Sequence, residues 1–177
     1  MTQAAALQVE QDLAEGKSML GFGTRPGAEG LGAFELGEHP LVIIAPRDWG
    51  LGRGEAVSVK ALDGKPFVAY SKNCTIRSDT DSFLAAYGVR PSIVTEVRFD
   101  NLIIGMVANS LGCAIIPVPS GTLSRRIDVV PIAEPQPPRT ICLLWNEGIP
   151  LSPAGERFRD YVRENPLKPL DFIKEMQ

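Results

Sequence analysis

The middle of the chain alternates strand-like and helix-like segments, and this alternation constrains the fold more than any other feature. The expected elements, in chain order, are a strand over 66–70, a helix over 79–87, a strand over 92–97, a helix over 100–110 and a strand over 113–117. Gly88 and Gly112 follow the two helices, as glycine commonly does at a helix end. Strands that alternate with helices typically form parallel sheets covered by helices. The sequence therefore predicts an α/β fold with mostly parallel sheets and flanking helices.

Outside this alternation the chain shows further strands and two more helices. Leu41–Ala45 is a continuous apolar run, which is typical of a strand buried on both faces. Ser152 and Pro153 predict a helix start, with serine as the cap and proline in the first turn. The remaining expected elements are a helix over 5–15, a strand over 19–23, a glycine-rich loop over 25–34, strands over 128–130 and 140–145, and a final helix to about Glu164 with Phe158, Tyr161 and Val162 facing inward.

Composition argues against several classes of protein. The 177 residues include 21 acidic and 18 basic side chains, so the chain is not expected to bind nucleic acid by charge alone. The three cysteines, Cys74, Cys113 and Cys142, are widely spaced and form no metal motif, so we expect free thiols, no metal and a reducing cytoplasm. We see no signal peptide and no unbroken apolar span, and so expect no membrane partner. His39, the only histidine, lies in a turn-like stretch, which argues against histidine-dependent catalysis.

Polar residues follow the first strand of the central alternation. In open α/β sheets, ligands bind outside the carboxyl ends of the strands. The segment 71–78 joins such an end to a helix, whose free N–H groups and dipole favour an anion. The residues expected to line a site here, with the Arg77 guanidinium also able to hold a carboxylate, are Ser71, Asn73, Cys74 and Thr75. A solvated loop beside a capped helix explains the same residues without a ligand.

Three other strand ends add candidates. Phe99 and Asn101 flank the next strand-to-helix turn, where Asp100 is expected to cap the helix. Thr24 follows the strand over 19–23, and Pro117 ends the strand over 113–117. Helix capping alone also explains the first of these turns. The full set of predicted ligand-binding residues is therefore small and polar, with one aromatic ring and one proline.

Four stretches resemble the effector-binding domain of LysR-type bacterial transcriptional regulators. They are LAEGKSMLGFG over 13–23, PLVIIAP over 40–46 with VSVKALDGKPFV over 57–68, MVANSLGCAIIP over 106–117, and LSPA over 151–154. The stretch over 106–117 is the most specific of these. Met19 stands where the family usually has an aspartate. The resemblance covers about residues 5 to 165.

The resemblance implies a type 2 periplasmic-binding-protein-like fold, in which two lobes hold a small-molecule cleft between them. The implied crossings lie near Glu35–Ile44 and Pro135–Cys142, with lobe one over 1–43 plus 139–177 and lobe two over 44–138. Family members begin with a helix-turn-helix DNA-binding domain, which we do not find in this sequence. Their effector domain then begins with a strand-helix-strand unit, which is also missing before the helix expected over 5–15. We therefore expect an N-terminally truncated fragment with an incomplete first lobe, which would meet DNA only through the absent domain.

The function implied by the resemblance is regulatory. It is the binding of a small organic anion as a non-covalent effector, with no catalysis and no covalent cofactor, in a cytoplasmic protein that forms a homodimer. A solute-binding protein of a transport system shares this fold and is the alternative; a small enzyme is a third possibility. Peroxide-sensing relatives place a reactive cysteine in the loop of Cys74, with a partner nine residues later. Phe83 occupies that later position, so the disulfide switch is not reproduced.

Overall fold

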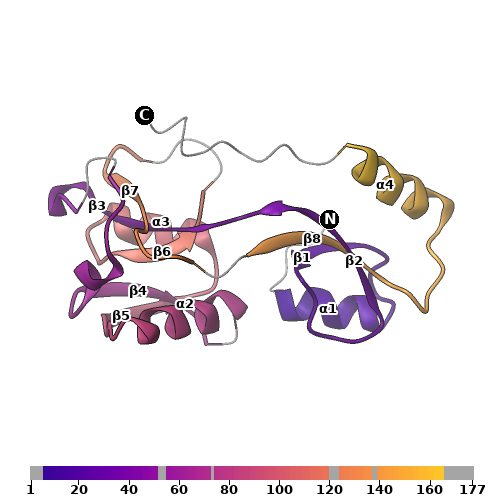
Figure 1. Cartoon of the computed structure of the whole chain (residues 1–177), viewed down its shortest axis with the longest axis horizontal. Helices are drawn as coiled ribbons and strands as arrows, with labels where there is room; N and C mark the ends of the chain where they lie inside the picture. Colours follow the sequence, from indigo (N-terminus) through magenta and orange to yellow (C-terminus); the bar gives the residue numbers. More distant parts are fainter. Residues whose placement is uncertain (1–5, 52–54, 73, 120–123, 137–138, 166–177) are drawn as a thin grey trace. The chain divides into compact units, whose positions relative to one another are not determined.

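The computed structural model describes residues 6–51, 55–72, 74–119, 124–136 and 139–165. These residues form two compact units (Figure 1). The described residues of the first unit are 6–39 and 139–165, and those of the second are 40–136. The chain thus passes from the first unit to the second after His39 and returns to the first unit between Gln136 and Arg139.

The first unit is a small antiparallel sheet with a helix on each face. Its strands are β1 (Gly21–Thr24), β2 (Leu31–Glu38) and β8 (Thr140–Asn146), in the order β1-β8-β2. Helix α1 (Ala6–Ala14) packs Leu13 against Cys142 and Leu144 of β8. Successive strand residues point to opposite faces, so Trp145 lies on the other face. There Arg159 of α4 (Pro153–Glu164) lies 5.8 Å from the centre of the Trp145 ring.

Helix α4 confirms one expectation and corrects another. The Ser152 hydroxyl accepts a hydrogen bond from the Gly155 amide, so the predicted cap is confirmed. The expectation that Tyr161 faces inward is wrong, because this residue is 63% exposed. Phe158 is 45% exposed, but its ring packs edge-on against Phe22 of β1, with 6.4 Å between the ring centres. Two arginines of α4 also cover the sheet: Arg159 lies over Trp145, and Arg163 lies over Phe34.

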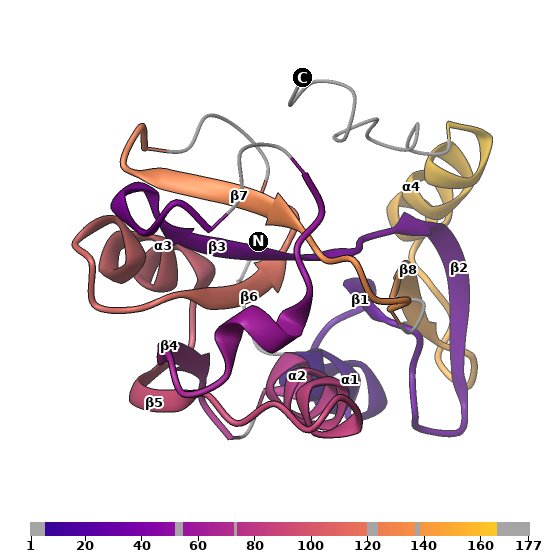
Figure 2. The same ribbon diagram turned by 60° about the vertical axis from the view of Figure 1, so that its left-hand side comes forward.

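The second unit is built around strand β3. Its strands are β3 (Leu41–Pro46), β4 (Pro66–Tyr70), β5 (Ser92–Val97), β6 (Ala114–Pro117) and β7 (Ile127–Pro131). β3 lies between β6 and β7 and is antiparallel to both (Figure 2). β4 pairs with β5 in parallel, and a parallel bridge from Phe67 to Cys113 connects β4 to β6.

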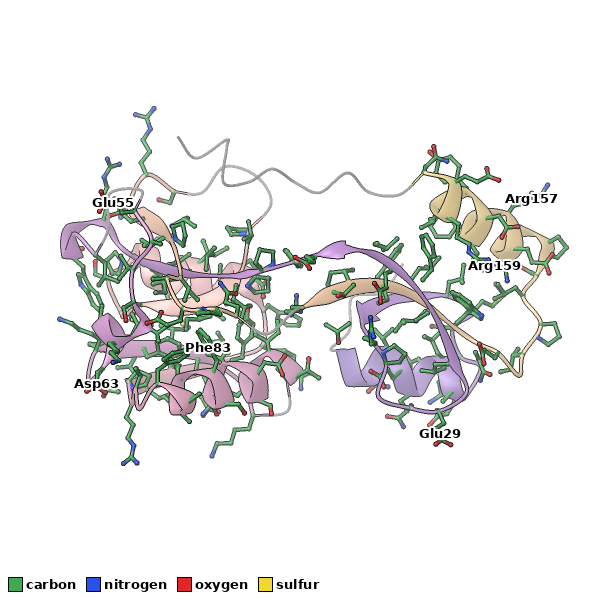
Figure 3. The ribbon with its side chains drawn as sticks, viewed as in Figure 1. Glu29, Glu55, Asp63, Phe83, Arg157 and Arg159 are labelled. Carbon is green, nitrogen blue, oxygen red and sulfur yellow. The ribbon has the colours of Figure 1, made fainter. Side chains whose placement is uncertain are left out.

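Two apolar clusters cover opposite faces of β3. Ile43 belongs to one cluster and Ile44 to the other, so the strand is buried on both faces as predicted. Helix α2 (Thr75–Ala86) contributes Phe83, labelled in Figure 3, to the first cluster. Helix α3 (Asp100–Ala108) contributes Ile103 to the second. Two 3-10 helices, η1 (Arg47–Trp49) and η2 (Val59–Leu62), complete the unit.

The predicted strand directions need correction. Among the described residues, four of the five strand pairings are antiparallel and only β4–β5 is parallel, so the expectation of mostly parallel sheets is wrong for the pairings. The reason is that the chain crosses from the first unit to the second and back again. β3 enters the second unit from the first, β8 enters the first from the second, and each runs antiparallel between its two neighbours.

Two element boundaries and one whole strand also differ from the sequence expectation. Helix α2 begins at Thr75 rather than Asp79, so the second half of the predicted polar loop is helical. β2 (Leu31–Glu38) was not among the expected strands, and its first residues lie inside the predicted glycine-rich loop. Helix α3 ends at Ala108, and Ser110 rather than a glycine adopts the left-handed backbone conformation, with φ of 60°. Gly88 has φ of 72° after α2, which confirms its expected role at that helix end.

Candidate functional site

The candidate site lies in the second unit, where β4 and β5 end side by side. The Ser71 amide, immediately after β4, donates to the Val97 carbonyl at the end of β5, at 2.9 Å. The Cys74 amide donates to the Ser71 carbonyl at 2.9 Å and closes a turn before α2. Ser71, Cys74 and Thr75 are half-buried. Asn73 falls outside the described residues.

The start of α2 presents backbone donors. Cys74 occupies the cap position with an extended backbone, and no side chain of the described residues caps this end. Thr75 is the first helical residue. The first N–H groups of a helix have no partner within the helix, and the helix dipole adds partial positive charge there. Together with the Thr75 hydroxyl, these groups form an environment that suits a carboxylate or another small anion.

Arg77 has a different role from the expected one. Its side chain is only 8% exposed. Its guanidinium donates to Asp81 at 2.7 Å, to Glu96 at 2.9 Å and to the Tyr70 carbonyl at 2.7 Å. Burial by itself lowers the pKa of Arg77, but the hydrogen bonds that it donates to Glu96 and Asp81 outweigh burial and raise the pKa. The carboxylates that Arg77 holds are therefore the protein's own.

The second strand-to-helix turn is also built differently from the expectation. Phe99, rather than Asp100, occupies the cap position of α3, and this residue is 40% exposed. The Asp100 carboxylate accepts a hydrogen bond of 2.6 Å from the Tyr70 hydroxyl. Asn101 lies exposed in the first turn of α3. Tyr70 thus connects the end of β4 to the start of α3, a contact that no sequence pattern indicated.

The two remaining candidates lie at other strand ends. Pro117 is buried at the end of β6, opposite Leu41 of β3. Thr24 ends β1 in the first unit, opposite Ile141. The neighbouring Arg25, which the sequence placed near a possible anion, forms an exposed ion pair with Glu35. Of the predicted residues, the structure therefore brings Ser71, Cys74 and Thr75 together in one turn.

Sequence reasoning missed the residues that support this turn. Tyr70 and Glu96 accept hydrogen bonds from Arg77 of α2, and Asp100 accepts one from the Tyr70 hydroxyl. Arg77 and Asp81 are four residues apart, a spacing that places two side chains together on a helix, and it was the one available signal. Glu96 lies in a strand far along the sequence, so nothing local linked it to Arg77.

The described residues show neither a metal site nor a membrane span. No group of three or more His, Cys, Asp or Glu side chains among them could hold a metal ion. No helix in the same residues is long and apolar enough to cross a membrane. Burial raises the pKa of the Cys113 thiol to about 12, so this thiol stays protonated.

Comparison with known families decides the identity of the chain. The family model of the LysR substrate binding domain matches residues 1–166. The chain belongs to the LysR substrate-binding domain family. Curated relatives of this LysR domain include two HTH-type transcriptional regulators. YybE of Bacillus subtilis is 27% identical over 129 residues, which are 73% of this chain and 44% of YybE. YnfL of Escherichia coli is 29% identical over 127 residues, 70% of this chain and 43% of YnfL.

The LysR domain thus spans less than half of the length of these two relatives. Solved structures of similar fold include the effector-binding domain of QuiR in complex with shikimate, with a TM-score of 0.81 and 22% identity, covering 93% of this chain and 79% of that one. The regulatory domain of Synechocystis PCC6803 CcmR in complex with 2-PG has a TM-score of 0.83 and 20% identity, over 92% of this chain and 80% of that one. These likenesses confirm the predicted type 2 periplasmic-binding-protein-like fold.

Proposed function

We propose that this LysR domain binds a small organic anion non-covalently as an effector, and that binding regulates a longer DNA-binding protein. The single observation behind the proposal is that half-buried Ser71, at the carboxyl end of β4, lies close to the start of α2 at half-buried Thr75, which no side chain of the described residues caps. The structural neighbours support it, because QuiR and CcmR are known in complex with shikimate and 2-PG. No metal or covalent cofactor is needed for this function.

A regulatory role fits the sequence relatives, which are transcriptional regulators rather than enzymes. His39, the one histidine, packs beside Arg139, with 3.3 Å between its Nδ1 and the guanidinium. We therefore propose no catalytic step. Contact with DNA would come from a helix-turn-helix domain outside this sequence.

We also propose that the chain acts in the cytoplasm as a homodimer. The exposed apolar side chains of Ile93 and Val94 lie on β5, which among the described strands pairs only with β4. Open strand edges with apolar side chains commonly serve as association surfaces. Light scattering in solution should therefore give twice the chain mass of 19.1 kDa. A constant mass of one chain over a hundredfold concentration range would contradict the dimer.

Thermal unfolding with shikimate, 2-PG and acetate tests the effector proposal. A ligand present at a hundred times its Kd stabilises the folded state by about 2.7 kcal/mol. That gain corresponds to a rise in Tm of about 5–10 °C for a chain of this size. We expect such a rise with at least one of the two larger acids, and little with acetate.

A double variant locates the binding site. Ser71→Ala with Thr75→Ala removes the two hydroxyl groups, and we expect most of the ligand-induced rise in Tm to be lost. Ser92→Ala is the matched control, because Ser92 is exposed at the opposite end of β5. Equal ligand-induced shifts in the double variant and the control would exclude this turn, and the absence of a shift in the unchanged protein would refute binding of these acids.

A further inference from the structure

Arg77 is the most buried charged side chain among the described residues, and its contacts converge on the candidate site. The guanidinium reaches three acceptors on three elements: Asp81 on α2, Glu96 on β5 and the carbonyl of Tyr70 on β4. Each contact is 2.7–2.9 Å long. A buried charge that loses one of its partners destabilises the folded protein strongly. The three contacts therefore fix α2, β4 and β5 relative to one another.

The Tyr70 carbonyl is the critical acceptor. Tyr70 is the last residue of β4, and Ser71 follows directly as the first residue of the site. Arg77 itself lies in the first turn of α2, and its amide donates to the Cys74 carbonyl at 3.0 Å. Arg77 thus contacts both sides of the candidate site, through its side chain at Tyr70 and through its amide at Cys74. The Tyr70 hydroxyl extends the same network to Asp100 at the start of α3.

The shape of the guanidinium matters as well as its charge. Arginine donates from several N–H groups in a rigid plane, whereas lysine offers a single flexible ammonium. The Arg77 Nε donates to the Asp81 carboxylate, and its Nη1 donates to both the Glu96 carboxylate and the Tyr70 carbonyl. A lysine at this position would keep the positive charge but could not hold all three acceptors in this geometry.

We propose that Arg77 is a positioning residue of the effector site. It does not touch the effector; it holds the end of β4 and the start of α2 so that the amides and hydroxyls of the turn face one bound anion. This inference rests on the proposed function. In this proposal Arg77 fixes the geometry of the site, and the start of α2 attracts the anion.

Two variants and two measurements test the proposal. Arg77→Lys keeps the charge and removes the planar donor set. Ser58→Ala is the control, because Ser58 also makes a side-chain contact within the second unit, with Glu134, and caps η2 rather than α2. Affinity for shikimate and 2-PG is measured by calorimetry well below the Tm of both variants. Hydrogen exchange of the Ser71 and Cys74 amides is measured without ligand.

The expected result is at least a tenfold weaker affinity for the bound acid in Arg77→Lys, with faster exchange at Ser71 and Cys74. Ser58→Ala should change neither, even where it lowers Tm. Equal affinity in Arg77→Lys and the unchanged protein would overturn the positioning role. If the unchanged protein binds neither acid, the proposed function fails for these ligands. In that case the exchange measurement still tests Arg77, because equal exchange rates at Ser71 and Cys74 in Arg77→Lys and the unchanged protein would overturn its positioning role.

Discussion

Replacing Gly112 by alanine should destabilise the second unit strongly. A Cβ atom built on Gly112 lies 2.6 Å from the Pro66 carbonyl oxygen and 3.1 Å from the Phe67 nitrogen. Both are backbone atoms of β4, so no side chain can rotate away. The added methyl group must therefore push β4 away from the segment that leads into β6.

The structure gives the scale of this effect. The Cys113 amide donates to the Pro66 carbonyl at 2.9 Å, and the Val68 amide donates to the Cys113 carbonyl at 2.8 Å. Overpacking typically costs about 1–3 kcal/mol, and each weakened hydrogen bond adds about 0.5–1.5 kcal/mol. We therefore expect a loss of about 3 kcal/mol, or a fall in Tm of about 6–12 °C.

Gly105→Ala is the matched control. Gly105 lies inside α3, and a Cβ atom there meets nothing within 4 Å. Alanine is favoured over glycine inside a helix by about 1 kcal/mol, so this variant should unfold at a slightly higher temperature. Thermal and urea unfolding, followed by circular dichroism, measure both variants. A Gly112→Ala protein as stable as the unchanged chain, or equal shifts in both variants, would refute the close-approach argument.

Two further predictions concern ionisable groups. Burial raises the pKa of the Glu134 carboxyl, but hydrogen bonds from the Ser58 hydroxyl and the Val59 amide outweigh it and lower the pKa below the ordinary 4.5. The carboxylate thus stabilises the fold above that pH and loses this effect as the pH falls through the lowered pKa. The difference in free energy of unfolding between the unchanged protein and Glu134→Gln should therefore shrink from pH 7 to pH 3. Glu29→Gln, at an exposed position, is the control. A difference that stays constant with pH, or an equal trend in the control, would contradict this. Burial also raises the pKa of Cys113 to about 12 and that of Cys142, so a thiol reagent should label half-buried Cys74 first and the other two only on unfolding, whereas equal native rates would contradict the assignment.

Much of the fold follows from local sequence patterns. The continuous apolar run over 41–45 predicted the buried strand β3, since apolar side chains on both faces leave no solvated side. Ser152 and Pro153 predicted the start of α4, because a cap depends on residues within one turn. The candidate turn was also visible, since polar residues followed a predicted strand end.

The structure groups the predicted polar residues of the turn as expected, but it gives Arg77 a different role. Ser71, Cys74 and Thr75 do lie together, because they are neighbours in the chain. Arg77 was expected to face a ligand, yet helix α2 begins early enough to turn it inward against Glu96. Whether an arginine meets solvent, a ligand or a buried carboxylate depends on the strand packed against its helix.

The sequence by itself determined most of the strands and helices, though not β2 or the start of α2, and it determined how two of the helices are capped or ended and where polar residues gather after β4. These properties depend on residues within a few positions of each other. The tertiary structure alone decided that β3 and β8 run antiparallel to their neighbours, that Gly112 must be small against the backbone of Pro66, and that Arg77 connects three elements. Those properties depend on partners brought together from distant parts of the chain, and no local pattern specifies such partners.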